Sequence, residues 1–396
     1  MPIAKERRTL IVIALGTAQT LAWGSTYYLP AILAAPMADS FGVSTGFVYG
    51  VFSIAMLITA FFGPGVGQRI DRFGGRGVLT TSSLVFALGL TLLGASPNLP
   101  VFVIGWLAIG LGMAMGLYEA GFATLTAIYG KDARSAITGI TLLAGFASTI
   151  CWPISTIVEA EWGWRIACYV WAAAHLLIGL PINRLLIPKT DSQASVSAAS
   201  VSSEAASIPD ASMFSRPMIL LGISFAAMWI TSTALAAHLP RILEAAGATK
   251  TVAVAAASLV GPAQVAARIL EHSVLQRYHP LLSARLATIT HPIGFAMLLI
   301  FGPAAAYVFT ILHGSGNGVI SIAKGTLPLA IFGPIGYGRR QGYLAAPSRF
   351  GQAAAPFVFA LLLEQYGHYV LLFTSGLCLI SLVALMLLRN TNEQAA

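Results

Sequence analysis

Long apolar runs without a single charge constrain this chain more than any other feature. Residues 77–95 and 371–388 contain no Asp, Glu, Lys or Arg. A helix needs about 20 mostly apolar residues to cross the hydrocarbon core of a bilayer. Of the 396 residues, 57% are hydrophobic and only 9% are charged, too few charges to cover the surface of soluble domains. Because the hydrophobicity is continuous and not alternating, an outer-membrane barrel is excluded, and we predict an all-α membrane protein.

Apolar runs between charged or Pro/Gly-rich positions predict twelve transmembrane helices in two sets of six. The first set covers residues 9–34, 45–66, 77–95, 101–128, 136–158 and 166–187, and the second covers 217–240, 251–270, 282–301, 304–330, 343–363 and 369–388. Between the sets lies a Ser/Ala-rich stretch with no apolar run long enough to span. We therefore expect two pseudo-symmetric six-helix bundles, residues 1–187 and 217–396, joined by a linker over 188–216. Gly63-Pro64 and Gly261-Pro262, near the ends of the second and eighth helices, support repeated halves.

The distribution of Lys and Arg predicts the orientation. Nineteen of the 22 basic residues fall on the side of the N-terminus, and only Arg165, Arg241 and Lys250 fall on the other. Loops rich in Lys and Arg stay in the cytoplasm. We expect a multi-pass protein of the cell inner (plasma) membrane with both termini and the linker cytoplasmic. The net charge of +8 then reflects topology and does not indicate a nucleic-acid partner.

A segment rich in glycine and charge joins the second and third predicted helices. It reads GQRIDRFGGR over residues 67–76. Glycines permit a tight turn, and the partial positive charge at the N-terminus of a neighbouring helix would stabilise a carboxylate such as Asp71. Arg72 and Arg76 are placed to hold carboxylates or lipid phosphates. The candidate functional residues of this segment, which the resemblance described next makes a gating loop, are Gly67, Asp71, Arg72, Gly74 and Arg76.

This G-x-x-x-D-R-x-G-x-R pattern resembles the loop signature of the major facilitator superfamily, and the six-plus-six layout extends the resemblance over essentially the whole chain. The resemblance implies alternating access around a central site, and a latch that stabilises the outward-open state by contacting the eleventh helix, which here would begin near Gly342. Arg69 departs from the Leu that is frequent in the family. The fourth-span arginine of drug/proton antiporters is also missing, because Trp106 precedes the Gly-rich stretch there.

Two further segments point to branches of that family. Residues 162–165, which read WGWR before the sixth helix, resemble the bacterial branch near monocarboxylate and organic-anion carriers. Residues 332–334 (FGP) and 337–339 (YGR) are similar to those of bacterial permeases, some of which are associated with arsenite and antimonite export. The resemblance leaves both substrate classes open.

Polar and aromatic side chains in the cavity-lining spans are the candidate substrate contacts. In the first span they follow i, i+4, i+8 spacing, and in the tenth span His313, Asn317, Ser321 and Lys324 share one face. The candidates are Gln19, Trp23, Tyr27, Tyr28, Tyr118, Trp229, Gln264, His313, Asn317, Lys324, Arg349 and Gln352. Helix packing is the alternative role for both stripes. Arg349 either binds an anionic substrate with two hydrogen bonds or extends to the cytoplasmic surface.

Glu119 is the one carboxylate placed well inside a predicted span, where burial favours its protonated form and suits a proton carrier. A static pair with a Lys or Arg is the alternative role. His175 and His291 fall in the sixth and ninth spans, which the resemblance implies are peripheral, and this favours structural or interfacial roles. Cys151, Cys168 and Cys378 lie in apolar stretches without a CxxC motif and are expected to be structural thiols, so no metal or other cofactor is predicted.

No phosphate-binding loop, HExxH or GxSxG motif occurs, so the chain is not expected to be an enzyme; an integral membrane enzyme is the rival class. We expect a monomeric secondary transporter that binds protons, a small-molecule substrate and the lipid bilayer. Proton-coupled export of a small toxic solute, a metalloid or a drug-like compound, is the first expectation. Proton-coupled uptake or exchange of a monocarboxylate or other organic anion is the alternative.

Overall fold

A computed structural model describes residues 5–189 and 214–388, and within them the chain is helical without strands. It divides into two compact units. Unit 1 comprises the described residues 5–189 and 332–346, and unit 2 comprises 214–331 and 347–388. The expected all-α membrane fold is confirmed. The predicted linker falls almost entirely outside the described residues, and the division into bundles 1–187 and 217–396 stays a prediction.

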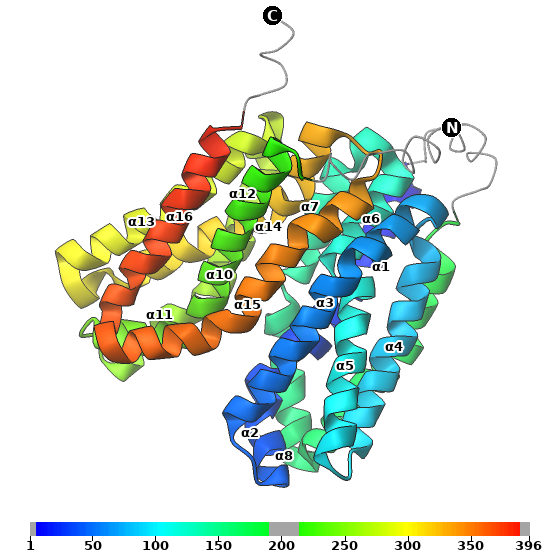
Figure 1. The fold of residues 1–396 in the computed structure, drawn as a ribbon, viewed down its shortest axis with the longest axis horizontal. Coiled ribbons are helices and arrows are strands. Elements are labelled where there is room, and N and C mark those ends of the chain that lie inside the picture. Colours follow the sequence, from blue (N-terminus) through cyan, green and yellow to red (C-terminus); the bar gives the residue numbers. More distant parts are fainter. Residues whose placement is uncertain (1–4, 190–213, 389–396) are drawn as a thin grey trace, which may run out of the picture. The chain divides into compact units, whose positions relative to one another are not determined.

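Unit 1 is built on side-by-side packing of long apolar helices. Its elements are α1 (Lys5–Ala22), a π-helical turn (Trp23–Tyr27), α2 (Pro30–Phe41), α3 (Thr45–Phe73), α4 (Gly75–Ala95), α5 (Leu99–Gly116), α6 (Tyr118–Tyr129), α7 (Arg134–Ala144) and α8 (Ala147–Ala174), followed by π-helical turns His175–Gly179 and Ile182–Leu186. Helix α5 packs against both α3 and α4, α1 packs against α7, and α4 packs against α8 (Figure 1).

Unit 2 has a core of aromatic and aliphatic side chains between its helices. Its elements are α10 (Arg216–Ala245), α11 (Lys250–Ser258), α12 (Val260–Ser273), α13 (Pro280–Phe301), α14 (Ala306–Phe332), α15 (Tyr337–Tyr366), which contributes its first ten residues to unit 1, and α16 (Val370–Met386). Helix α16 packs against α10 and α13. Leu239, Phe295, Phe309, Phe359 and Leu371 are among the buried side chains of this core.

Seven described segments are long and apolar enough to cross a membrane, and several of them contain two or three of the predicted spans. The sequence predicts continuous helices for these spans, and several of the helices are broken. The first is divided between α1, the π-helical turn and α2. The fourth breaks at Leu117, whose backbone is extended, and the eighth breaks at Leu259. Apolar composition fixes where a span lies, but a break costs little when other groups satisfy the freed backbone atoms.

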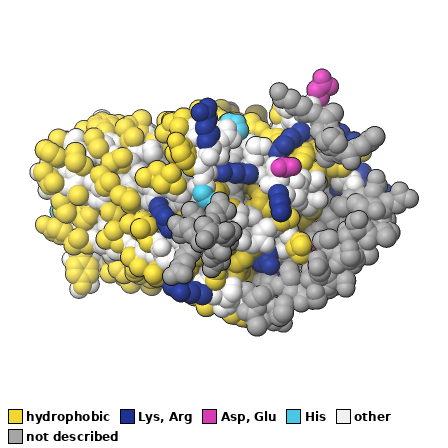
Figure 2. Space-filling view, turned by 90° about the horizontal axis from the view of Figure 1, so that it is seen from above, with side chains coloured by type: hydrophobic (Ala, Val, Ile, Leu, Met, Phe, Trp, Pro, Cys, Tyr) yellow, Lys and Arg dark blue, Asp and Glu magenta, His cyan; other side chains and the backbone are white. Residues whose placement is uncertain are grey.

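The outer surface of both units is strongly apolar. Phe61 and Leu177 in unit 1 and Ile300 and Phe357 in unit 2 each expose more than two thirds of their surface. Figure 2 shows hydrophobic side chains over a broad area, with Lys and Arg gathered among polar atoms on the face that is viewed. Exposed apolar area on this scale fits a lipid environment.

Glycines bring α3 and the first turns of α15 into backbone contact inside unit 1. A Cβ atom on Gly67 would overlap the Gly338 carbonyl, and one on Gly342 would overlap the backbone of Gly63 and Pro64. Gly63 and Gly67, like Gly338 and Gly342, are four residues apart and therefore share a helix face. Small residues at this spacing are a frequent solution to helix association in membranes, because close backbones gain dispersion energy.

We expect Gly67→Ala to destabilise the protein by about 1–3 kcal/mol, because the added methyl group overpacks this contact. Gly65→Ala is the matched control, since Gly65 lies in the same helix and a methyl group there would meet no atom within 4 Å. Thermal unfolding of the detergent-purified variants measures the difference. Equal midpoints for the two variants would contradict this role of Gly67.

Candidate functional site

Asp71 caps the N-terminus of α15 within unit 1. Its Oδ1 accepts a hydrogen bond from the Gly338 N–H and its Oδ2 accepts one from the Arg339 N–H, both at 2.8 Å. The first N–H groups of a helix have no partner inside the helix and carry partial positive charge. The carboxylate therefore neutralises the start of α15. Helix α15 begins at Tyr337, five residues before the position expected from the sequence.

The segment around Asp71 is helix and not loop. Helix α3 continues to Phe73, and Gly74 is the single residue between α3 and α4. Gly74 has a φ of 76°, so this one glycine makes the turn that the sequence assigns to the glycines in general. Gly67 lies inside α3, where its role is close packing. Arg72 is exposed and Arg76 is half-buried.

Four aromatic side chains that the sequence predicts as substrate contacts form one cluster in unit 1. The Trp23 ring centroid lies 5.0 Å from that of Tyr27, 6.1 Å from Tyr28 and 4.8 Å from Tyr118. Trp23 and Tyr27 lie in the π-helical turn, and Tyr118 opens α6. π-Helical turns are frequent at functional sites because the extra residue reorients side chains. The structure thus groups residues that are far apart in the sequence into one aromatic surface.

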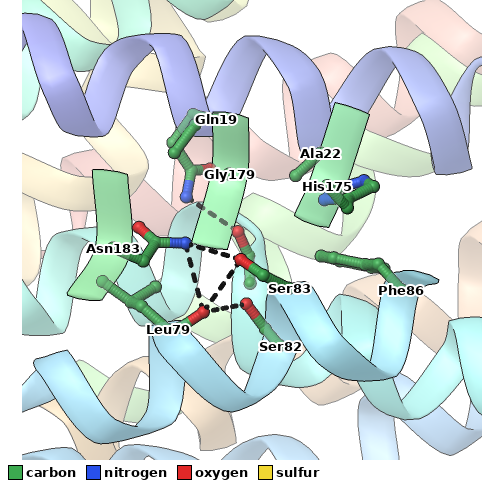
Figure 3. A pocket seen from close by; sticks show the side chains of 11 residues that line it. Gln19, Ala22, Leu79, Ser82, Ser83, Phe86, His175, Gly179 and Asn183 are labelled. Atoms are coloured by element: carbon green, nitrogen blue, oxygen red, sulfur yellow. Dashed lines mark hydrogen bonds between the residues drawn. The ribbon is translucent and has the colours of Figure 1, made fainter. Parts of the chain in front are cut away.

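Gln19 provides a hydrogen-bond donor for the backbone at the break between α5 and α6. Its Nε2 donates a hydrogen bond of 2.8 Å to the Gly116 carbonyl, at the last residue of α5. It also lines a small cavity beside His175 and Asn183, whose Nδ2 donates to the Leu79 carbonyl and to the Ser83 hydroxyl (Figure 3). The cavity measures about 10 Å³, the room that one water molecule needs, and is too small for an organic solute.

Three polar residues beside Gln19 are absent from the sequence-based candidates. Asn183 holds α4 through its amide, and His175 is joined through Nε2 to the Ser25 hydroxyl at 2.8 Å. All three, Ser25, His175 and Asn183, are buried. In the sequence, each of these residues is recognisable only as a polar residue inside an apolar run. This pattern does not reveal which residue it bonds to. A structural role for His175 agrees with these contacts.

Lys324 and Trp229 meet in unit 2. The Lys324 Nζ atom lies 4.9 Å from the centroid of the Trp229 ring, a cation–π geometry. One helical turn after Trp229, the Thr233 hydroxyl accepts a hydrogen bond of 3.1 Å from Gln352 Nε2. Arg349, which is 1% exposed, donates to Gln352 Oε1 at 3.4 Å. Helices α10, α14 and α15 thereby present two cations, an amide and an aromatic ring.

The polar residues predicted to share one face of α14 contact several different helices. His313 bonds to His291 of α13, the Ser321 hydroxyl accepts from Arg268 of α12, and Lys324 faces Trp229 of α10. Asn317 and Gln264 are half-buried. Gly314 and Gly318 abut the α12 backbone, so these glycines provide close packing between the two helices.

Glu119 lies in the first turn of α6, directly after the break at Leu117, and is half-buried. The sequence predicts a position for Glu119 in the middle of an unbroken helix. Among the described residues, no group of three or more His, Cys, Asp or Glu side chains is arranged to hold a metal ion.

Comparison with known proteins fits this architecture. The family model of the Major Facilitator Superfamily matches residues 15–334. The chain belongs to this superfamily. It is thus a multi-pass membrane transporter and not an enzyme, and transporters of this family bind small-molecule substrates and often use a proton.

Relatives and solved structures add detail. Monocarboxylate transporter 14 of Mus musculus is 29% identical over 140 residues, and a probable polyol transporter 3 of Arabidopsis thaliana is 26% identical over 132 residues. These alignments cover 35% and 30% of this chain but only 27% and 24% of the relatives. FucP in the outward conformation matches with a TM-score of 0.71, 13% identity and coverage of 96% of this chain and 99% of FucP. The proton:xylose symporter XylE matches with a TM-score of 0.67 and 14% identity over 96% and 93%.

We expect Asp71→Asn to lower transport several-fold while the protein still folds. An amide has one acceptor oxygen and no charge, so one of the two backbone N–H groups loses its partner, at a cost of about 1–2 kcal/mol. The accessibility of engineered cysteines from the two sides of the membrane reports which state is depleted. Asp39→Asn, at an exposed acid near the end of α2, is the control. Unchanged accessibility and turnover in Asp71→Asn would contradict a gating role.

Proposed function

We propose that this chain is a proton-coupled transporter of small organic anions of the monocarboxylate class. It works by alternating access, as a monomer in the cell inner (plasma) membrane, with both termini cytoplasmic and no nucleic-acid partner. The observation that carries the proposal is the excess of buried cations in unit 2.

Among the described residues, the buried charged side chains are Arg268, Glu271, Lys324 and Arg349. Three are cations and one is a carboxylate, and all four belong to unit 2. Charges removed from water are costly unless opposite charge and hydrogen bonds accompany them. An anionic ligand offsets the excess of one sign, whereas a cationic drug would add to it.

The groups around Lys324 suit an organic carboxylate in particular. Ammonium and guanidinium groups form strong, short hydrogen bonds to carboxylate oxygens, and Arg does so with two parallel bonds. The Trp229 ring offers an apolar face for the carbon skeleton. Thr233 and Gln352 add a hydroxyl and an amide for a second polar group on the substrate.

The comparisons support the same substrate class. Two of the relatives are named monocarboxylate transporter 14, from Mus musculus and Homo sapiens. The structural relatives are described as a proton:xylose symporter and a fucose:proton symporter, which supports proton coupling here.

Export of a metalloid, the first expectation from the sequence, has less support. Trivalent arsenic and antimony are soft centres that favour several thiolate ligands at once. Cys151 and Cys168 lie in α8 of unit 1, whereas Cys378 lies in α16 of unit 2, and all three are buried. Purified protein in proteoliposomes, tested with short monocarboxylates, a polyol, arsenite and a cationic drug under an imposed pH gradient, decides between the classes and gives the direction. Transport of arsenite or the drug without any carboxylate would overturn the proposal.

We expect Lys324→Gln to raise the KM for a monocarboxylate about tenfold, because one charge-assisted hydrogen bond contributes about 1.5–3 kcal/mol. Uptake of the radiolabelled carboxylate as a function of concentration measures the change. Lys250→Gln removes an exposed cation of unit 2 and is the matched control. If both variants transport like the unmodified protein, the buried cations do not bind the substrate.

We expect Glu119→Gln to abolish the response to a pH gradient while substrate exchange at equal pH persists. A carboxyl group at the start of α6 is able to gain and lose a proton as its exposure to water changes between states, and the amide is not. Glu161→Gln, at an exposed acid of the same unit, is the control. Gradient-driven accumulation that survives in Glu119→Gln would remove this residue as a coupling site.

A further inference from the structure

A buried chain of hydrogen bonds joins α13, α14 and α16 of unit 2, apart from the candidate anion site. The Nδ1 atoms of His291 and His313 are 3.1 Å apart, and His291 Nε2 lies 2.8 Å from the Thr374 hydroxyl. Thr374 is fully buried, His291 is 1% exposed and His313 is 5% exposed. The three side chains come from helices that are far apart in the sequence.

Thr374, the last residue in this series of hydrogen bonds, sets the direction of the others. The Thr374 hydroxyl also bonds to the Leu371 carbonyl at 3.1 Å, and a carbonyl only accepts. With the Thr374 hydrogen directed to the Leu371 carbonyl, the Thr374 oxygen accepts from the His291 Nε2–H. A neutral imidazole carries one N–H, so His291 Nδ1 is an acceptor and the Nδ1–H of His313 is the donor to it. The other ring nitrogen of neutral His313, Nε2, then carries a lone pair and no hydrogen.

In this arrangement His313 can gain a proton without the loss of a hydrogen bond, whereas His291 cannot. Protonation at His313 Nε2 leaves the Nδ1–H donor in place, so the whole chain of hydrogen bonds survives. Protonation of His291 at Nδ1 would instead set two N–H groups against each other. His313 is also the more exposed of the two rings, and the Phe309 ring stacks beside it with centroids 6.2 Å apart.

On the three helices that carry this hydrogen-bond chain, the charged side chains other than histidine are cations. Helices α13, α14 and α16 contain no Asp or Glu. Their cations are Arg285, which donates to the carbonyls of Leu385 and Leu388, and Lys324, eleven residues along α14 at the Trp229 ring. Cys378 is the thiol on α16.

Three neighbouring helices carry further titratable groups. Helix α12, which abuts α14 at Gly314 and Gly318, contributes Arg268, Glu271 and His272. Helix α10, which packs on α16, contributes Arg216, His238, Arg241 and Glu244. Helix α15, whose Phe359 ring lies 5.6 Å from that of Phe373 in α16, contributes Arg349 and Glu364. His238 is bonded to the Pro356 carbonyl, and Arg268 donates to Ser321. A proton on His313 thus adds a cation to a unit whose buried charges are already mostly positive, so an arriving anion favours its uptake.

We propose that His313 Nε2 is a proton-binding site, that His291 and Thr374 fix its tautomer as positioning residues, and that binding of the anion in unit 2 and protonation of His313 favour each other. The proposal rests on the proposed function for its anion. It adds to Glu119 a second proton site, in the other unit. Because coupling between two ligands is reciprocal, the proton must raise the affinity for the anion by the same factor as the anion raises the affinity for the proton.

The first test needs no transport. In ¹⁵N spectra of the histidine-labelled protein, assigned with His313→Asn and His291→Asn, we expect His313 to carry its proton on Nδ1 and His291 on Nε2. We expect His313 to titrate to the doubly protonated form at a higher pH when a monocarboxylate is present. A His313 that carries its proton on Nε2, or that stays neutral over the whole pH range at which the protein is folded, overturns the proposal.

The second test is transport by reconstituted protein. His313→Asn retains an amide N–H near the position of Nδ1–H, so it still donates to His291, but it has no nitrogen that takes up a proton. We expect exchange of the monocarboxylate at equal pH to stay within about twofold and pH-driven accumulation to fall about tenfold or more. His175→Gln is the matched control, because His175 is an equally buried ring, bonded through Nε2 to Ser25 in unit 1.

Thr374 separates positioning from packing. Thr374→Val removes the hydroxyl at nearly constant volume and frees both rings to change tautomer, so we expect the pH midpoint of transport to shift by about half a unit or more. Thr374→Ser retains the hydroxyl and should restore the midpoint. An unchanged midpoint in Thr374→Val contradicts the positioning role.

The two proposals fail in different ways. If the unmodified protein transports none of the carboxylates, the proposed function fails, and the ¹⁵N titration without anion still tests His313. If carboxylates are transported and His313→Asn keeps the full response to the pH gradient, the proposed function stands and the proton site at His313 is wrong.

Discussion

A hydrocarbon environment offers no hydrogen-bond partner, and this constraint organises the polar groups of the chain. At two helix ends, backbone groups that lack a partner within the helix are met by side chains from another helix. Gln19 donates to the end of α5, and Asp71 accepts from the start of α15. In water such helix ends would be solvated, and neither side chain would be needed there. The buried polar side chains therefore supply the hydrogen-bond partners that these helix ends require.

Close packing of backbones makes the Asp71 contact possible. A carboxylate on a short side chain reaches the first turn of α15 because Gly67 and Gly338 let the two helices touch. Dispersion at the glycines and electrostatics at the helix N-terminus act on the same pair of helices. The contact between α3 and α15 thus combines close glycine packing, which depends on shape, with a carboxylate cap, which depends on charge.

The two units differ in how they treat charge. In unit 1 the buried polar groups are amides, hydroxyls and a histidine beside an aromatic cluster. In unit 2 they include three cations and a hydrogen-bonded pair of histidines. In a medium of low dielectric constant, an anion and a proton that enter such a region stabilise each other strongly. The proposed anion transport and the proposed proton coupling would both follow from this one charge distribution.

The sequence by itself determined the solvent, the fold class and the family. Continuous apolar runs require lipid, and the spacing of glycines and charges around Asp71 is a local pattern that a linear reading detects. Helix ends were less predictable: Leu117 and Leu259 interrupt runs whose composition favours an unbroken helix. Pairing was beyond the sequence altogether. Lys324 and Trp229 are 95 positions apart, and the choice of His291 as the partner of His313 depends on how α13 and α14 pack. Hydrophobicity is a property of each segment and is additive along the chain, whereas a hydrogen bond between helices depends on rotation and depth, which only tertiary packing fixes.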